Sequence, residues 1–459
     1  MKVREPSVGP IVGATGAGSV RILVRGELEL EGGKPRRAHG VARLRERGRE
    51  FGPPRFFKLN PNFDLTGVVV FEGLSPETAY DYEAGWFFSE ADSAALDASA
   101  ALDWAEAPRR GFTTASGDGG RERSFVFGSC RYLLRLFGGA WFDDRSDKTF
   151  GSIVRQIEAG RRTDAFLMIG DQIYADDLDE FRADQCVDGF FARYRDAFTT
   201  RGLRELMARV PTYMTLDDHE IEDDWPARAA RQDHVRKLPA AMHAYQVYQL
   251  SHSPAQPARG GKLEGTPGAL SYAFTDGCAD VFVTDTRTER VLDEGARRIV
   301  SPEQLAALQS FLGDGSGRVK IVVSSVPLFG AAGVDKWEGF FEQRDALLGF
   351  IRENKVRRVL ALSGDVHASF TAELGCDDDP DFKIVSVVSS PFFWPYRRPL
   401  AGHFQTQGYI RSEGKYRVTA CTPIVIEDNF TRITVDPRGV RVEVFGRKGG
   451  ALGQSAHAF

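Results

Sequence analysis

The chain has no long hydrophobic run and no recognisable export signal. None of its apolar stretches approaches the ~20 residues that a bilayer-spanning helix needs. The first six residues, MKVREP, are not followed by the apolar stretch of a signal peptide. We therefore predict no membrane span. For the sequence as it stands we predict a cytoplasmic location, and a periplasmic or secreted one if an export signal was trimmed.

Cysteine and excess positive charge are also scarce. Five cysteines occur in 459 residues, and none has C-x-x-C spacing, so they do not indicate a disulfide framework. The 59 basic residues are outnumbered by 64 acidic ones, which gives a formal net charge of −5. Without a global positive field we expect no general nucleic-acid binding, and phosphate groups could be bound only locally. Neither a G-x-S-x-G elbow nor a Walker A loop is present. The sequence carries no signal for the oligomeric state.

The first quarter of the chain has the pattern of an all-β module. Strand-like runs at residues 20–25, 67–71 and 79–86 are separated by turns rich in glycine and proline. Residues 73–82, GLSPETAYDY, resemble a turn and tyrosine-bearing strand common in fibronectin-III-like domains. A small, glycine-rich stretch at 114–120 follows. We predict an immunoglobulin- or fibronectin-III-like β-sandwich at residues 1–115 and a second domain at 116–459.

The second domain has the alternation of an α/β fold. Strand patterns near Phe125, Phe166, Tyr213, Val281, Val319 and Val359 alternate with helical patterns at 150–160, 190–209, 238–250, 302–312 and 341–354. Later runs at 383–388, 432–435 and 440–444 read as strands, the last two joined by a turn. We therefore expect a second sheet or a mixed one.

Acidic and histidine side chains follow several of the predicted strands directly, where open α/β sheets place their ligands. Asp171 ends one apolar strand and Tyr174 comes three residues later, so one loop could present two oxygen donors to a cation. An N-capping aspartate with a packed tyrosine is the structural alternative.

A second acidic segment follows the strand near Tyr213. Asp217, Asp218, His219 and Glu220 are consecutive, and repulsion among them favours a compensating cation over an exposed acidic helix start. Asp223 and Asp224 add carboxylates that could reach the same ion or a neighbouring one.

Two further strand ends carry candidate ligands. Asp365 and His367 have i, i+2 spacing, which places both side chains on one side of an extended backbone. Cys130 ends the first strand of the α/β region; a buried free cysteine is normally inert, but near a cation its thiolate could bind iron or zinc. These residues complete a predicted metal site.

Arginines and aromatic residues near these motifs have more than one interpretation each. Arg287 or Arg290 could hold an anionic substrate with a guanidinium fork, or form salt bridges with Asp285 or Glu289. The segment 391–396, PFFWPY, could form an aromatic wall beside the site, part of the core or a subunit interface, and we favour core packing.

Five of these motifs resemble, in their residues and their order, those of PhoD-type alkaline phosphatases/phosphodiesterases. They are Gly-Ser-Cys, Gly-Asp-x-x-Tyr, Asp-Asp-His-Glu, Asp-x-Arg and Gly-Asp-x-His. The resemblance spans most of residues 120–370 and implies membership of the calcineurin-like and purple-acid-phosphatase-like metallophosphoesterases. It implies a four-layer α/β/β/α sandwich with two metals at the strand ends, preceded by an all-β module.

The resemblance also implies roles for the candidate residues. Asp171 would bridge two ions, with Cys130, Tyr174 and His367 toward a ferric site. Asp218, Asp365 and either Asp217 or Asp224 would serve a calcium site. Mn²⁺, Zn²⁺ and Mg²⁺ are alternative ions. His219 would contact the phosphoryl group or leaving oxygen, and Arg287 would neutralise the substrate phosphate.

These roles predict hydrolysis of phosphodiesters, phosphomonoesters or both by a metal-bound hydroxide. The alternative is a non-catalytic metal- or phosphate-binding protein whose β module engages a partner. The chain departs from the resemblance in two respects. It lacks the twin-arginine signal typical of the family, and it has Asp223 and Asp224 where asparagines are frequent.

Overall fold

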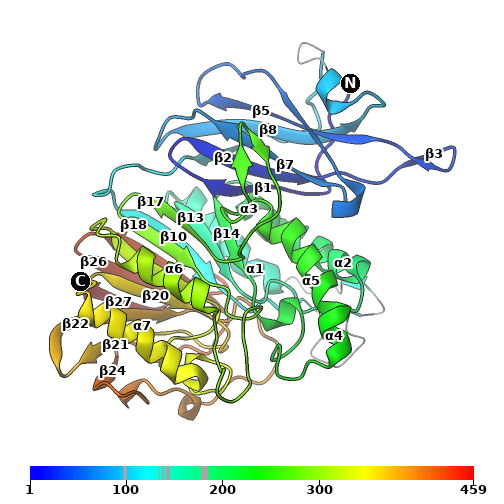
Figure 1. Ribbon diagram of the computed structural model, residues 1–459. Coiled ribbons are helices and arrows are strands. Elements are labelled where there is room, and N and C mark those ends of the chain that lie inside the picture. Colours follow the sequence, from blue (N-terminus) through cyan, green and yellow to red (C-terminus); the bar gives the residue numbers. More distant parts are fainter. Residues whose placement is uncertain (97–100, 134, 137–138, 141–144, 177–183) are drawn as a thin grey trace.

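The computed structural model describes residues 1–96, 101–133, 135–136, 139–140, 145–176 and 184–459. Figure 1 shows an N-terminal module of strands, in blue at the top, resting on a larger body of sheets and helices. No helix among these residues is long and apolar enough to cross a membrane. The predicted boundary at residues 115 and 116 falls between the last strand of the module and the first strand of the body.

The N-terminal module consists of two antiparallel sheets. Their orders are β1-β2-β7 and β6-β5-β8-β9, and a short exposed hairpin, β3-β4, extends from them. The three predicted strands are confirmed as β2, β7 and β8. The bounds are β1 (Val8–Thr15), β2 (Ser19–Arg25), β3 (Leu30–Glu31), β4 (Lys34–Pro35), β5 (Ala38–Glu46), β6 (Arg55–Lys58), η1 (Pro61–Phe63), β7 (Thr66–Glu72), β8 (Ala79–Phe88), η2 (Ser93–Ala95) and β9 (Arg110–Thr113).

The module is held together by its own hydrophobic core. Val20, Ile22 and Val24 alternate along β2, so they share one face of that strand. They pack with Tyr82 and Trp86 of β8.

The body contains two mixed sheets. The first has the order β14-β13-β10-β25-β26-β27, with β10, β13 and β14 parallel and the others antiparallel. The predicted hairpin is β25-β26. The bounds are β10 (Arg123–Gly128), β13 (Ala165–Ile169), β14 (Thr212–Thr215), β25 (Asn429–Asp436), β26 (Gly439–Gly446) and β27 (Ala451–Ala458).

The second sheet has the order β17-β18-β19-β20-β22-β21-β24-β23, with a parallel centre of β18, β19, β20 and β22. Its bounds are β17 (Tyr272–Asp276), β18 (Ala279–Val283), β19 (Val319–Ser324), β20 (Val359–Ser363), β21 (Phe370–Cys376), β22 (Asp379–Val388), β23 (Gln407–Tyr409) and β24 (Tyr416–Ala420). Two small hairpins join β11 (Arg135–Leu136) to β12 (Gly139–Ala140) and β15 (Ala258–Arg259) to β16 (Lys262–Leu263).

Helices cover the outer faces of both sheets (Figure 1). The first sheet is covered by α1 (Arg145–Glu158), α2 (Val187–Phe198), α3 (Arg201–Met207) and α5 (Lys237–Tyr245), and the second by α6 (Pro302–Leu312) and α7 (Phe341–Glu353). The region predicted as one helix at 190–209 is two, because the chain breaks at Thr199 and Thr200 before α3 starts. Shorter segments are η4 (Asp218–Glu220), α4 (Arg231–Val235), η5 (Gln246–Leu250), η6 (Trp337–Phe340) and η7 (Ala401–His403).

Strand periodicity divides the apolar side chains between the layers. In β10, Phe125 and Phe127 join the core between the two sheets, whereas Val126 joins the core beneath the helices of the first sheet. In β19, Ile321 faces the inter-sheet core and Val322 the helices of the second sheet. Continuous apolar strands are therefore needed on both sheets, and the predicted α/β/β/α sandwich with its β module is confirmed.

Candidate metal centre

The candidate residues gather where parallel strands of both sheets end. β10 ends before Cys130, β13 before Asp171, β14 before Asp217, and β20 before Asp365. The loops are joined by hydrogen bonds: the Cys130 N–H donates to the carbonyl of Gly170 at 3.2 Å, and the Asp365 N–H donates to Ser129 Oγ at 3.0 Å. Residues separated by more than two hundred positions thus meet at one edge.

A close approach between the sheets requires Gly364. A Cβ at this position would lie 2.2 Å from Ser129 Oγ, well inside van der Waals contact. The glycine before Asp365 therefore allows the loop after β20 to reach the loop after β10. This is a structural reason for the Gly-Asp-x-His pattern.

Five candidate ligands have left-handed backbones. The φ angles of Cys130, Asp171, Asp224, Asp365 and His367 lie between 51° and 67°. Such conformations are costly for non-glycine residues and persist where the surrounding structure enforces them, frequently at functional sites. Here they occur in the loops that carry the candidate ligands beyond the strand ends.

The Asp171 carboxylate is the centre of a first group of donors. Its Oδ2 accepts from the Cys130 thiol at 3.2 Å and from the Tyr174 hydroxyl at 3.4 Å, and all three residues are buried. Burial raises the pKa of each of these groups, and the negative charge of Asp171 raises those of Cys130 and Tyr174 further. The buried Asp171 Oδ1 has no hydrogen-bond partner. A cation would satisfy that oxygen and favour the thiolate and phenolate.

Asp217, Asp218 and Asp365 form a second group, and Arg287 lies against it. Their ligand oxygens lie within 4.8 Å of one another. Arg287 Nε donates to Asp217 Oδ1, which also accepts from Ser325 Oγ at 2.8 Å. The other guanidinium end is 3.4 Å from Asp218 Oδ1 and 3.8 Å from Asp365 Oδ1.

Two features of this second group bear on cation binding. Asp217 Oδ2 is buried without a hydrogen-bond partner, as an unused ligand oxygen would be. Burial raises the pKa of Asp365 to about 7, although Lys336 opposes this by pairing with its carboxylate. For Asp218 burial also opposes ionisation, but the charges of Arg287 and His219 outweigh it and lower its pKa. The carboxylates of this second group thus share the few positive charges of Arg287, Lys336 and His219.

Asp224 lies at the outer side of this group. Its N–H donates to Asp218 Oδ2 at 2.7 Å, and Asp218, Asp223 and Asp224 place ligand oxygens within 4.8 Å. The Asp224 carboxylate also pairs with Arg228 at 3.0 Å and is partly exposed. It can therefore reach an ion at the edge of the centre.

His219 is held as a proton donor by a neighbouring carboxylate. Its Nδ1 is 2.8 Å from Asp176 Oδ2, and its ring lies 4.2 Å from the ring of Tyr174. Burial opposes protonation, but the negative charges of Asp176, Asp218 and Asp171 outweigh it and raise the pKa of His219. A charged imidazole with one nitrogen fixed leaves Nε2 to donate a proton.

His367 has the opposite electrostatic environment. Burial, together with the charge of His219, lowers its pKa to about 3, so the imidazole is neutral and able to bind a metal. Its ring stacks on Trp394 at 3.9 Å with an interplanar angle of 23°. Among the described residues, the groups of donors within 4.8 Å of one another include neither His367 nor Cys130.

The aromatic segment serves two of the interpretations it was given. Phe392 packs in the core beneath the helices of the first sheet. Trp394 stacks on His367 and clusters with Tyr132, Tyr174 and Tyr396 beside the centre. The preference for core packing is therefore right for Phe392 and also for Trp394, whose buried cluster borders the centre through His367.

Sequence reasoning gave no role to Asp176 or Lys336, and it treated Glu220 only as part of the acidic run. Glu220 accepts the N–H groups of Asp171, Gln172 and Asp217 at 3.1, 2.7 and 2.7 Å, and so ties two ligand loops together. Asp176, two residues after Tyr174, could have been found from the usual need of a catalytic histidine for an orienting carboxylate. Lys336 lies in a loop with no motif to mark it.

A family model described as PhoD-like phosphatase matches residues 134–395, more than half of the chain. Alkaline phosphatase D of Bacillus subtilis (strain 168) is 27% identical over 218 residues, which cover 40% of this chain and 35% of that protein. The match thus spans about a third of the length of this curated relative.

Two solved structures share the fold over nearly the whole chain. The structure titled "Structure of PhoD" has a TM-score of 0.72 at 18% identity and covers 99% of this chain and 89% of its own. A purple acid phosphatase from yellow lupin (Lupinus luteus) seeds has a TM-score of 0.60 at 14% identity, covering 98% and 74%. At these identities the likeness concerns the fold, and the family model is what assigns the chain: it belongs to the PhoD-like phosphatase family.

Proposed function

We propose that this protein is a metal-dependent phosphoesterase that hydrolyses phosphodiesters, phosphomonoesters or both. The observation that carries the proposal is the convergence of two carboxylates, Asp171 and Asp218, with the imidazole of His219: their side-chain oxygen and nitrogen atoms lie within 4.8 Å of one another in a buried site. Buried carboxylates at this density need compensating cations. The partnerless oxygens Asp171 Oδ1 and Asp217 Oδ2 support the same conclusion.

The donor chemistry favours two different ions. A thiol, a phenol and a carboxylate around Asp171 suit a ferric ion, with His367 as a neutral ligand, whereas the carboxylates of Asp217, Asp218, Asp224 and Asp365 suit calcium. Mn²⁺, Zn²⁺ and Mg²⁺ are the alternatives. When bound, such a pair supplies Lewis acidity to the phosphoryl oxygens and lowers the pKa of water from 15.7 to about 7.

The residues of the chain would orient the ester and move the proton. His219, kept charged and oriented by Asp176, would donate from Nε2 to the leaving oxygen. Arg287 holds Asp217 through Nε, and its Nη2, which lies 3.4 Å from Asp218 Oδ1 without a hydrogen bond, would turn from that carboxylate to a phosphate oxygen. A phosphate is thereby neutralised locally in a protein of net negative charge.

The test is hydrolysis of bis(4-nitrophenyl) phosphate and of 4-nitrophenyl phosphate by the purified protein, before and after chelation. Iron and calcium are then added back singly and together. We expect turnover that disappears on chelation and returns with metal. The ratio of the two rates distinguishes a diesterase from a monoesterase.

The matched control is His219→Asn, which leaves every carboxylate of the centre in place. We expect this variant to bind the same number of metal equivalents and to lose turnover. If the wild-type protein binds metals but hydrolyses neither ester, the proposal fails. The alternative, a metal- or phosphate-binding protein that uses its β module to engage a partner, would then be favoured.

A further inference from the structure

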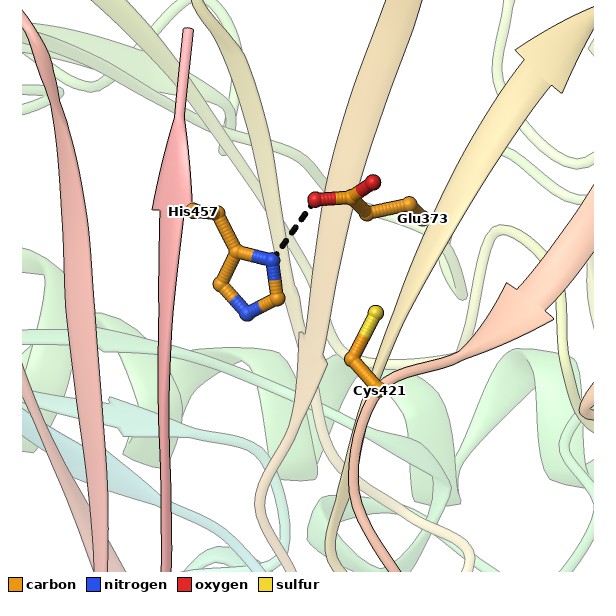
Figure 2. A group of neighbouring side chains, drawn as sticks. All are labelled: Glu373, Cys421 and His457. Carbon is orange, nitrogen blue, oxygen red and sulfur yellow. Dashed lines mark hydrogen bonds and ion pairs between the residues drawn. The ribbon is translucent and has the colours of Figure 1, made fainter.

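A second cluster of metal-ligating side chains lies outside the centre described above. Glu373 is on β21, Cys421 directly follows β24, and His457 is on β27. One ligand atom from each lies within 4.8 Å of those of the others. Figure 2 shows the three side chains pointing toward one another from three separate segments.

The cluster lies where the two sheets meet, away from the carboxyl ends that carry the first centre. β21 and β24 are neighbours in the second sheet, whereas β27 is the edge strand of the first. Following the strand register, His457 pairs with Val440, Val440 with Val435, and Val435 with Arg123, the first residue of β10. His457 is thus level with the opposite end of the sheet from Cys130.

The imidazole of His457 is held in one orientation. Its Nδ1 is 2.7 Å from Glu373 Oε1, and its Nε2 is 2.8 Å from Ser455 Oγ. The residue is only 7% exposed, so these contacts are sheltered from water. In metal sites the nitrogen that does not bind the ion is generally fixed by such a second hydrogen bond. Ser455 therefore aims Nδ1 toward Glu373 and Cys421.

The donor set selects a borderline cation. A thiol, an imidazole and a carboxylate are the ligands that Zn²⁺ uses, whereas Ca²⁺ and Mg²⁺ prefer oxygen alone. Bonds of about 2.0–2.3 Å in a tetrahedron place ligand atoms roughly 3.5 Å apart, so small side-chain rotations close this group around an ion. Cys421 is exposed, which gives an ion access from solvent.

We propose that Glu373, Cys421 and His457 form a second site, for one borderline divalent cation with Zn²⁺ as the best fit. In the bound form the Cys421 thiol has lost its proton to solvent, the proton shared between His457 Nδ1 and Glu373 has also been released to solvent, and the imidazole carries one proton on Nε2, donated to Ser455. The ion takes the position between Nδ1 and the Glu373 carboxylate. It joins the edge strand of the first sheet to two strands of the second.

Lys383 competes for the same carboxylate. Its Nζ lies 3.4 Å from Glu373 Oε1, and its side chain is 33% exposed, so it can turn toward solvent. Its positive charge opposes the approach of a cation. Removing that charge with Lys383→Met is therefore expected to tighten zinc binding, whereas a simple Glu373–His457 ion pair has no such consequence.

The test compares alkylation of two exposed cysteines, Cys421 and Cys186, with and without Zn²⁺, by peptide mapping after iodoacetamide treatment. Cys186 precedes α2 and serves as the internal control. A thiolate held by zinc is a poor nucleophile, so we expect labelling of Cys421 to slow by roughly tenfold or more. Labelling of Cys186 is expected to stay unchanged, as is labelling of Cys421 in the presence of Mg²⁺.

Two variants make the result specific. His457→Ala keeps the thiol and is expected to abolish its protection by zinc. Cys421→Ser changes only an exposed side chain and is expected to bind one zinc equivalent fewer than Cys186→Ser at equilibrium, with ester hydrolysis retained. Equal stoichiometry in the two serine variants, or equal protection of the two cysteines, would overturn the proposal. Neither readout requires turnover, so the result is independent of the proposed phosphoesterase activity.

Discussion

Two clusters of charge, one partly buried and one buried, surround their carboxylates in opposite ways. At the interface between the β module and the body, Asp64 accepts from Arg25 at 2.9 and 3.0 Å, from Arg195 at 2.7 Å, and from Tyr248. Burial opposes its ionisation, but the Arg25 and Tyr248 hydrogen bonds outweigh this and lower the pKa of Asp64. At the metal centre, by contrast, Asp171 and Asp217 each keep one buried oxygen without a hydrogen-bond partner.

The difference separates a carboxylate whose ion pairs stabilise the fold from carboxylates that are available to bind cations. Asp64 is a single carboxylate surrounded by donors, and its contacts join β2 and η1 of the module to α2 and η5 of the body. The metal centre concentrates several carboxylates around few donors, an arrangement that costs folding free energy unless a cation is bound. Four predictions sharpen this contrast.

The largest effect is expected at the bridging carboxylate. Asp171→Asn removes a charge on which both proposed ions depend, so ester hydrolysis should fall by about 10³-fold or more. Without metal, urea unfolding should show unchanged or increased stability, because like-charge repulsion in a buried site is relieved. Asp378→Asn, in an exposed turn, is the control and should change neither quantity. A variant that keeps its turnover would contradict the assigned role.

The interface cluster should respond in the opposite sense. Asp64→Ala leaves the partly buried guanidinium groups of Arg25 and Arg195 without their carboxylate, and we expect a loss of about 3 kcal/mol in the free energy of unfolding. The folded fraction should keep its kcat. Asp92→Ala removes an exposed partner of Arg37 and should cost well under 1 kcal/mol. Equal losses in the two variants would remove the contrast between the clusters.

The same interface should make stability depend on pH. Burial lowers the pKa of His252 to about 4 from its usual 6.5, and Gly13 of the module packs directly against it. The unfolded chain then binds the proton more readily than the folded chain does. The stability that the neutral His252 contributes to the folded state is therefore fully present above about pH 6.5 and is lost as the pH falls toward 4. Between about pH 7.5 and pH 5 the loss amounts to about 2 kcal/mol.

His252→Gln should flatten that dependence in urea unfolding at the two pH values. The exposed His403→Gln should keep the wild-type slope. A His252 variant with an undiminished slope would show that other groups cause the pH dependence.

The smallest effect is expected from the carboxylate that orients His219. Asp176→Asn can still accept from Nδ1 but carries no charge, so the imidazolium loses stabilisation and its pKa falls. We expect kcat to drop by roughly tenfold, with KM little changed, and the alkaline limb of the pH profile to move to lower pH. A change in KM alone would indicate a structural role for Asp176 instead.

Much of the fold was predictable because strand and helix periodicity is a local property. The apolar run of β13 and the strand-like run of β2 between turns predicted their elements correctly. The break at Thr199 and Thr200 was missed, although threonine is a weak helix former and a preferred N-cap residue, because the apolar residues on both sides keep a helical spacing. The motif residues were predictable because each one directly follows an apolar strand. Asp176 and Lys336 were not, since their roles depend on which side chains come to face them.

The sequence by itself determined the α/β alternation and the strand ends that carry the ligands, because both follow from short-range patterns of apolar and acidic residues; the four-layer arrangement was implied only by the resemblance to a family. Only the tertiary structure decided how those ligands are used. Left-handed backbones occur at Cys130, Asp171 and Asp365 in the loops that carry the ligands, and Arg287 is placed among carboxylates. The tertiary structure also brings Glu373, Cys421 and His457 together from two sheets. No sequence motif can mark these residues, because their proximity arises from the order of the strands.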